Sequence, residues 1–126
     1  FRENAAEYKA KADAVGQAEI YRNDYAISLC RSEGIQSPTI VGAQAANELL
    51  NIRGIKASFV LTEYQGRIYI SARSIDEVNV QVIMERMGGG GHMNVAGCQV
   101  DNSEPGAVIG TIKGTLDKMI EEGELK

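Results

Sequence analysis

Apolar residues recur three or four positions apart in four stretches of the chain, which is the spacing of one face of an α-helix. In the first stretch, residues 2–18, the repeating positions are Ala5, Tyr8, Ala12 and Val15, with charged residues between them. We therefore expect a helix with a narrow apolar face at the start of the chain, and the sequence leaves open whether this face packs internally or against a missing partner. The other stretches predict helices over residues 38–50, over residues 80–87 and from Pro105 onward.

Two segments rich in β-branched and aromatic residues predict hairpins. In the first, Arg22-Asn23-Asp24 forms the turn, because Asn and Asp accept the positive φ of a tight connection. In the second, the connection is the four-residue loop Glu63-Tyr64-Gln65-Gly66. The predicted strands are residues 20–21 and 25–29, residues 58–62 and 67–73, and a single further strand over residues 95–100.

The strand over residues 67–73 alternates strictly between apolar and polar side chains, so one of its faces is core and the other is polar. Helices mixed with hairpins in this way indicate an α+β domain, with a mostly antiparallel mixed sheet covered by helices. No internal repeat or low-complexity linker divides the chain, so we expect a single domain. The apolar positions are Ile68, Ile70 and Ala72, and the polar ones are Arg67, Tyr69, Ser71 and Arg73.

The composition is that of one globular domain: 126 residues, of which 44% are apolar and 24% charged. A formal net charge of −4 argues against a protein that holds a long nucleic acid by phosphate neutralisation alone. We therefore expect any anionic ligand to be bound locally. No run of residues approaches the apolar length of a membrane helix.

Two cysteines, Cys30 and Cys98, and a single histidine, His92, cannot build a Cys/His zinc site of ordinary spacing. We therefore predict no metal ligand in this chain, so any metal chemistry must come from elsewhere. The first residue, Phe1, is not a methionine, and no signal peptide follows it. On that ground we expect the chain to be a piece excised from a larger protein.

A run of four glycines between the third helix and the last strand is the most unusual feature of the sequence. Glycine is costly in regular structure, so such a run indicates a sharp bend or a close approach of the backbone. It favours a loop whose N–H groups hold phosphate oxygens, although a Schellman-type helix end explains it as well. The Lys and Ser/Thr of a Walker loop do not follow it. The residues concerned are Gly88, Gly89, Gly90 and Gly91, followed by His92 and by the small pair Ala96 and Gly97.

A phosphate at this loop would need cationic side chains, because the loop follows the negative end of a helix dipole. His92 can donate from a ring nitrogen, and Arg73, with Ser71 on the same strand face, offers a planar fork of five donors. Taken alone, Arg73 is more typical of a solvated or salt-bridged strand residue than of a phosphate ligand, and His92 is as typical of a structural hydrogen bond as of a ligand contact. Tyr69, on the same face, would stack on a base or simply cover the sheet.

The glycine run carries a resemblance to a known family. Gly88–His92, followed after two residues by Val95-Ala96-Gly97, resembles the Gly-Gly-Gly-His and Ala-Ala-Gly signature of the DHH-associated domain, with Val95 in place of the first Ala. Ser71-Ala72-Arg73-Ser74 looks like the Ser-x-Arg-Ser strand end of that family, and Asn79 falls where relatives carry Asp or Asn. This domain is the C-terminal lobe of the DHH phosphoesterases.

The stretch from Ser71 to Val100 looks most similar to the membrane-bound cyclic di-AMP phosphodiesterases of the GdpP type. The resemblance implies a substrate-binding lobe that contacts phosphate and nucleotide through Arg73, Ser71, the glycine run and His92, with Asn79, Ala96 and Gly97 in support. Manganese would belong to a preceding DHH lobe that is absent here, and the two lobes together would hydrolyse cyclic di-AMP to pApA. The resemblance thus implies half an active site, with no catalytic residue in this chain, which alone would be inactive.

Other assignments stay open within the same resemblance. Relatives that cleave short oligonucleotides or 3′-phosphoadenosine 5′-phosphate share the glycine–histidine element, and a related lobe in alanyl-tRNA synthetase-like proteins binds nucleic acid without catalysis. We expect residues 1–17 to be a leading helix or linker and residues 18–126 to be the binding domain. The resemblance implies a cytoplasmic domain without membrane contact of its own, in a membrane-anchored parent. The sequence leaves a homodimer open.

Overall fold

The computed structural model describes residues 2–125, and its centre is a six-stranded sheet with the strand order β1-β2-β3-β4-β6-β5. All neighbouring strands are antiparallel except β2 and β3, which are parallel and are joined through helix α2. The elements are α1 (Ala5–Gly16), β1 (Glu19–Tyr21), β2 (Tyr25–Cys30), α2 (Pro38–Leu49), β3 (Ala57–Tyr64), β4 (Arg67–Ser74), α3 (Val80–Arg86), β5 (Gly90–Gly91), β6 (Val95–Asp101) and α4 (Pro105–Glu121).

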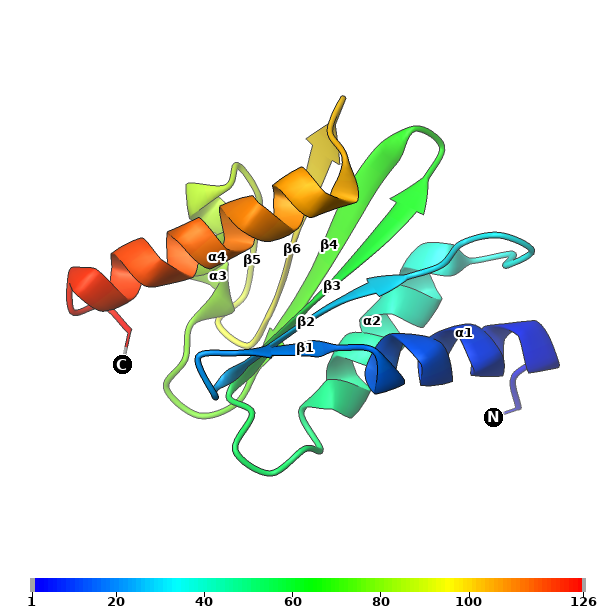
Figure 1. Ribbon diagram of the computed structural model, residues 1–126, viewed down its shortest axis with the longest axis horizontal. Helices are drawn as coiled ribbons and strands as arrows, with labels where there is room; N and C mark the ends of the chain where they lie inside the picture. Colours follow the sequence, from blue (N-terminus) through cyan, green and yellow to red (C-terminus); the bar gives the residue numbers. More distant parts are fainter. Residues whose placement is uncertain (1, 126) are drawn as a thin grey trace.

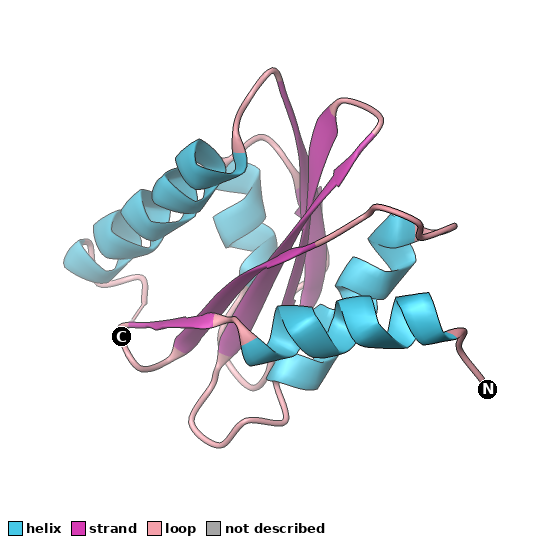
Figure 2. Cartoon of the chain, turned by 45° about the vertical axis from the view of Figure 1, so that its right-hand side comes forward, coloured by secondary structure: helices cyan, strands magenta, loops and turns pink. Residues whose placement is uncertain are grey.

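The helices lie in two layers, one on each side of the sheet (Figure 1). Figure 2 shows the sheet nearly edge-on, with α3 and α4 on one side and α1 and α2 on the other. The prediction of an α+β domain with a mostly antiparallel mixed sheet covered by helices is thereby confirmed. No helix within residues 2–125 is long and apolar enough to cross a membrane.

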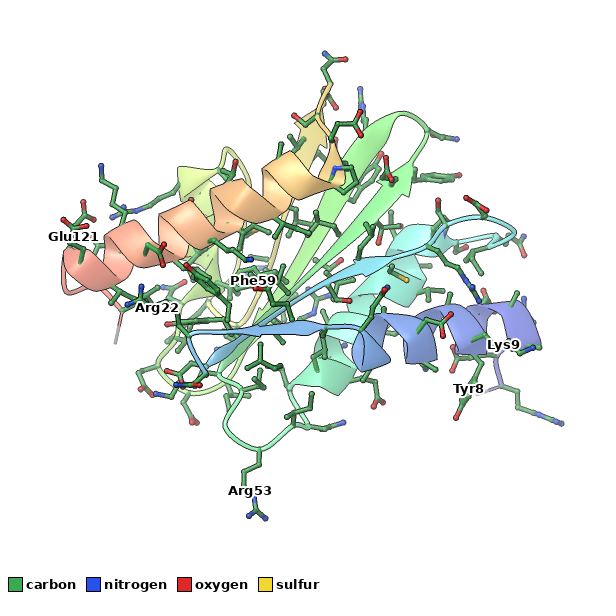
Figure 3. All side chains as sticks on the ribbon, in the orientation of Figure 1. Tyr8, Lys9, Arg22, Arg53, Phe59 and Glu121 are labelled. Carbon is green, nitrogen blue, oxygen red and sulfur yellow. The ribbon has the colours of Figure 1, made fainter. Side chains whose placement is uncertain are left out.

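Each helical layer encloses its own apolar core. The larger core lies under α3 and α4, and it includes Phe59, whose side chain points into the interior in Figure 3. The smaller core, under α1 and α2, contains five alanines among its eleven buried residues, and its largest members are Ile35, Leu49 and Ile55. Ser58 lies in this second layer and donates a buried hydrogen bond to the Ala46 carbonyl at 2.6 Å.

Helix α1 forms as predicted, and the side that packs internally is not the apolar face that the spacing indicated. Tyr8 is 62% exposed and points away from the body of the molecule (Figure 3), whereas Ala10 and Ala14 are fully buried. Small side chains are buried here because α1 packs closely against α2 and β2. Helical spacing alone does not show which face a close neighbour requires.

Both hairpins form, with one change in the second. The turn at Arg22 and Asn23 has the positive φ angles of 52° and 69°. The second connection comprises only Gln65 and Gly66, with φ angles of 52° and 79°, instead of the four-residue loop that was predicted. A two-residue turn with positive φ at both positions matches the twist of its strands, so β3 extends through Tyr64.

Candidate functional site

A groove of about 510 Å³ lies over β4 and β6, on the sheet face that also carries α2. It joins segments that are far apart in the sequence: the start of α2, the polar face of β4, the glycine run and the outward face of β6. The predicted alternation of β4 is observed, with the even-numbered residues Ile68, Ile70 and Ala72 buried. The groove is lined by Thr39, Tyr69, Ile70, Ser71, Gly88, Gly89, Gly90, Gly97, Cys98 and Gln99.

The floor of the groove is almost free of side chains. Ser71 on β4 pairs with Gly97 on β6, and Gly97 pairs with Gly90 on β5, so a serine and two glycines form one row across three strands. A Cβ atom added at Gly97 would lie 2.9 Å from the Ile70 carbonyl oxygen. A Cβ atom added at Gly90 would meet nothing within 4 Å. The floor therefore lets a ligand approach the sheet backbone closely.

Three of the four glycines have structural reasons to lack a side chain. Gly88 has a φ of 91°, and a Cβ on Gly89 would lie 2.2 Å from the Gly97 carbonyl oxygen. Gly91 has a φ of 145°, and its Cβ would lie 2.6 Å from the Ala96 Cα. Gly90 alone has neither a positive φ nor a close neighbour. Its lack of a side chain therefore has no packing reason, and it keeps the groove open.

The backbone hydrogen bonds of the glycine run limit what it can donate to an anion. The Gly88 N–H donates to the Glu85 carbonyl at 3.1 Å, and the Gly89 N–H donates to the Met84 carbonyl at 2.8 Å. These two bonds close the end of α3 in a Schellman-type arrangement. The predicted phosphate-holding nest of amides is therefore not formed by these two groups, and the Schellman reading is correct for the first half of the run.

Arg73 provides a positive charge at one end of this sheet face. It lies two residues beyond Ser71 and pairs with Val95, just past the residues that line the groove. Its guanidinium donates to the Ala72 carbonyl at 2.9 Å and, more weakly, to the Ala96 carbonyl at 3.5 Å. Within residues 2–125 it forms no ion pair with a carboxylate. Its charge is thus left uncompensated inside the domain.

Partial burial lowers the pKa of the Arg73 guanidinium from its ordinary value. Because that ordinary value is far above neutrality, the side chain stays charged at physiological pH. A half-buried cation with carbonyl partners but no anion is a favourable place to bind a phosphate, which the planar fork can grip with two hydrogen bonds. This environment differs from that of a solvated surface arginine.

His92 follows β5 and is exposed. Its backbone N–H donates to the Val95 carbonyl at 2.7 Å, which continues the β5–β6 pairing, so this amide too is occupied. No hydrogen bond of its imidazole is present among the described residues. A purely structural role for the side chain thus has no support, and the ring is free to meet a ligand.

A small polar cluster joins the end of β4, next to Arg73, to the turn that follows His92. Ser74 donates to the Val78 carbonyl at 2.6 Å, and Asn94 donates to the Ser74 hydroxyl at 3.0 Å. The second serine of the Ser-x-Arg-Ser element therefore ties the end of β4 to the turn that follows His92. It fixes the backbone beside Arg73 and His92 and does not line the groove.

Two residues predicted to support the site have other roles. Asn79 caps helix α3, where its side chain accepts a hydrogen bond from the Val82 N–H at 3.3 Å. The side chain of Ala96 is only 7% exposed and lies in the larger core, on the opposite sheet face, so only its carbonyl reaches the site. Neither residue lines the groove.

Two groove residues were missed at the sequence level. Gln99 lies two positions beyond Gly97 on β6, so the alternation of that strand would have indicated it. Thr39 comes from the first turn of α2, and only the fold brings it to β4. The N-terminus of α2 carries a partial positive charge, which opposes the unfavourable dipole of α3.

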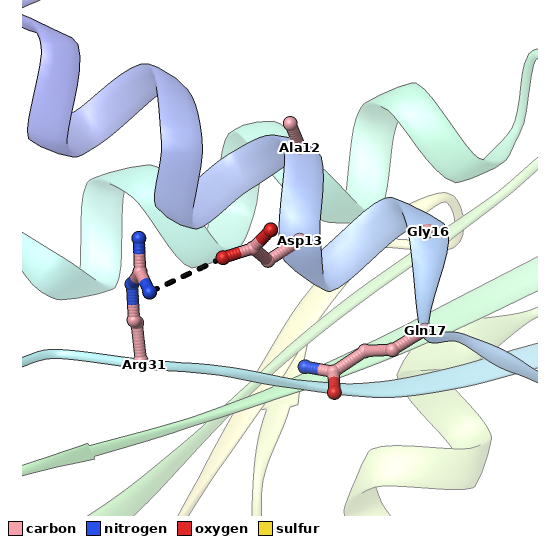
Figure 4. Close-up of a pocket in the computed structure, with 5 residues that line it drawn as sticks. All are labelled: Ala12, Asp13, Gly16, Gln17 and Arg31. Atoms are coloured by element: carbon pink, nitrogen blue, oxygen red, sulfur yellow. Dashed lines mark ion pairs between the residues drawn. The ribbon is translucent and has the colours of Figure 1, made fainter.

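A second hollow lies between α1 and the end of β2, as Figure 4 shows. Asp13 and Arg31 face each other there and form an ion pair at 3.2 Å. Both side chains are about half exposed, at 58% and 52%, and their charges cancel. The hollow therefore has less uncompensated charge to bind a charged ligand than the Arg73 end of the groove has.

The described residues provide little for metal or thiol chemistry. No group of three or more His, Cys, Asp or Glu side chains within residues 2–125 could hold a metal ion. Cys30 and Cys98 are free and buried, and burial raises the pKa of both thiols. Neither cysteine is thus poised as a thiolate nucleophile at neutral pH.

Two relatives with a named activity match most of this chain. The chain is 36% identical over 124 residues to the cyclic-di-AMP phosphodiesterase GdpP of Geobacillus thermodenitrificans, with 98% of this chain and 19% of the relative covered. It is 39% identical over 100 residues to the cyclic-di-AMP phosphodiesterase PdeA of Listeria monocytogenes, with 79% of this chain and 15% of that protein covered. The chain thus spans less than a fifth of the length of these relatives.

A solved structure shares the fold at low sequence identity. An exopolyphosphatase-related protein from Bacteroides fragilis superposes with a TM-score of 0.81 at 18% identity, over 94% of this chain and 36% of that one. The profile of the DHHA1 domain matches residues 24–122, which include both the groove and the Arg73 end of the sheet. The resemblance carried by the glycine–histidine element is thereby confirmed, and the chain belongs to the DHHA1 domain family.

Proposed function

We propose that this chain is the substrate-binding lobe of a manganese-dependent phosphodiesterase that hydrolyses cyclic di-AMP to pApA. The observation that carries the proposal is the uncompensated charge of Arg73 beside a floor of glycines. A cyclic dinucleotide combines phosphates, which need cationic donors, with flat bases, which need close access to a surface. The site offers both features within one sheet face.

The similarity to two cyclic-di-AMP phosphodiesterases supports this substrate over a short oligonucleotide or 3′-phosphoadenosine 5′-phosphate. The net charge of −4 weighs against a module that grips long nucleic acid through many phosphates. We further propose that the parent protein is anchored in a membrane and holds this lobe in the cytoplasm.

In this proposal the lobe binds and orients the substrate. The Arg73 guanidinium and the His92 imidazole hydrogen-bond the non-bridging oxygens of the phosphate and fix it for in-line attack by water. Preorganised donors of this kind stabilise the charge that develops on those oxygens in the transition state. Ser71, one row further along the strand face, offers its hydroxyl to the same phosphate or to the adjoining sugar.

Manganese ions would activate the water in such an enzyme, but the residues described here do not fit that task. They contain no cluster of metal ligands, and His92 is the only histidine in the chain. The proposal therefore places the metal ions in a separate lobe and assigns no metal-dependent step to this one.

The test uses the protein expressed at its full natural length, with Mn²⁺ and cyclic di-AMP. We expect Arg73→Gln to lower kcat/KM about 30-fold, because a lost charge-assisted hydrogen bond is worth about 2 kcal/mol. His92→Ala should also lower it, by about tenfold. Both variants keep the backbone pairings of β4 and β5 intact.

The matched control is Arg53→Gln, which removes an exposed arginine on the loop after α2 (Figure 3) that does not line the groove. This variant should retain the kcat/KM of the unmodified protein. Unchanged kcat/KM in Arg73→Gln and His92→Ala would remove both residues from the site. Absence of cyclic di-AMP hydrolysis by the natural-length protein would overturn the proposed substrate.

A further inference from the structure

The end of the groove away from Arg73 has a chemistry of its own. Tyr69 and Gln99 face each other across the β4–β6 pairing, and both line the groove. Tyr69 lies four residues from Arg73 on the same strand face, a separation of about 13 Å at the usual rise of a strand. An aromatic ring and an amide therefore occupy a position that a nucleotide bound by its phosphate at Arg73 can reach.

The ring of Tyr69 packs against a second aromatic ring. Tyr64, at the end of β3, packs against it with the ring centroids 6.4 Å apart and the planes inclined by 50°. Such tilted pairs are favourable and restrict both rings. Because Tyr69 also lines the groove, its ring is left as a supported platform for a flat ligand.

The amide of Gln99 has a defined orientation. Arg67 donates to the Gln99 Oε1 at 3.3 Å, and a guanidinium has no acceptor, so the oxygen of the amide must face Arg67. Arg67 is itself paired with Asp101 at 3.2 Å. The Nε2 group of Gln99 is therefore left to donate to a ligand, and it suits an acceptor such as a ring nitrogen or carbonyl of a nucleobase.

We propose that Tyr69 and Gln99 form a nucleobase subsite, in which Tyr69 stacks on the face of the base and Gln99 donates to an acceptor on its edge. This inference deepens the proposed function, since it rests on a nucleotide phosphate held at Arg73. Tyr64 and Arg67 act as positioning residues behind the two contacts. Between the two ends, the serine–glycine row leaves room for the sugar.

The test measures the Kd of two ligands for the 126-residue chain by NMR titration of its amide signals. AMP carries base, sugar and phosphate, whereas ribose 5-phosphate carries the same sugar and phosphate without a base. We expect the unmodified chain to bind AMP about tenfold tighter than ribose 5-phosphate, in keeping with a stacked base. Tyr69→Leu should abolish this preference by weakening AMP alone, and Gln99→Leu should reduce it.

Two further variants separate stacking from structural damage. Tyr69→Phe keeps an aromatic face and should retain the preference for AMP, whereas Tyr8→Leu, at an exposed position on α1, should change nothing. Equal binding of AMP and ribose 5-phosphate by the unmodified chain would overturn the base subsite. So would a Tyr69→Leu variant that weakens both ligands equally or neither.

The phosphate end has a separate readout. Arg73→Gln should weaken both ligands by a similar factor, because both carry the phosphate. If it weakens neither, the proposed phosphate contact fails. If Arg73→Gln acts on both ligands but Tyr69→Leu has no effect, only the base subsite fails.

Discussion

The sheet face beneath α1 and α2 has two halves that are built differently. Over β2 and β3 it is sealed: Ala45 and Ala46 of α2 are fully buried there, and so is Ser58 beneath them. Over β4 and β6 the same alternation continues, but the equivalent positions hold Ser71 and Gly97 and line an open groove. One half contributes stability, and the other leaves space for a ligand.

The glycine run repeats this contrast on a smaller scale. Gly89 and Gly91 pack against the backbone of β6 and have no room for a methyl group, whereas Gly90 faces open space. Neighbouring residues of one type thus have opposite reasons to be glycine. Packing explains the first two, and only the open groove explains the third.

The largest loss of stability is expected from a substitution at Gly89, which is a packing position. A Cβ at this position would lie 2.2 Å from the Gly97 carbonyl oxygen and 2.8 Å from the Cys98 Cα, and a backbone neighbour cannot rotate away. We expect Gly89→Ala to lower the free energy of unfolding by about 3 kcal/mol, as for a severe overpacking. Urea denaturation followed by circular dichroism measures it. A loss below about 0.5 kcal/mol, the usual range of a surface change, would show that Gly89 is not a packing position.

Some of this could be predicted from the sequence, because the relevant signals are local. The alternation in β4 separated Tyr69, Ser71 and Arg73 from the core, since a strand has a period of two whatever it packs against. The glycine run stood out because glycine is costly in regular structure, and His92 stood out because it ends that run. The short pairing of Gly90 and Gly91 with β6 was not predicted, since two glycines carry no strand signal.

Other features depend on tertiary contacts that no local pattern contains. The buried face of α1 comprises Ala10 and Ala14 because of the close approach of α2, and Tyr8 is left outside. Thr39 reaches the groove only because the β2–α2–β3 crossover brings the start of α2 beside β4. The orientation of the Gln99 amide is fixed by Arg67, from a strand that is not adjacent to it in the sequence.

The sealed half can be probed with two buried hydroxyl groups on β3. The Thr62 hydroxyl is buried without a hydrogen-bond partner among the described residues, whereas the Ser58 hydroxyl donates to the Ala46 carbonyl. We expect Thr62→Val to raise the free energy of unfolding by about 1 kcal/mol, because valine has a similar shape and carries a methyl group in place of the unsatisfied hydroxyl. Ser58→Ala should lower it by about the same amount. Destabilisation by Thr62→Val would contradict this description of the sealed half.

The open half is tested most directly at Gly90, where the expected change in stability is the smallest. Gly90→Ala adds a methyl group that meets no atom within 4 Å, so the free energy of unfolding should change by less than about 0.5 kcal/mol. Gly110→Ala is the matched control, because that glycine lies on α4, also has open space around it and is remote from the groove.

The decisive measurement is kcat/KM for cyclic di-AMP in the natural-length protein carrying Gly90→Ala. We predict a loss of about tenfold or more, since the methyl group occupies the floor on which the ligand lies. Gly110→Ala should keep full activity. If Gly90→Ala is as stable and as active as the unmodified protein, the glycine-floored groove is not the site.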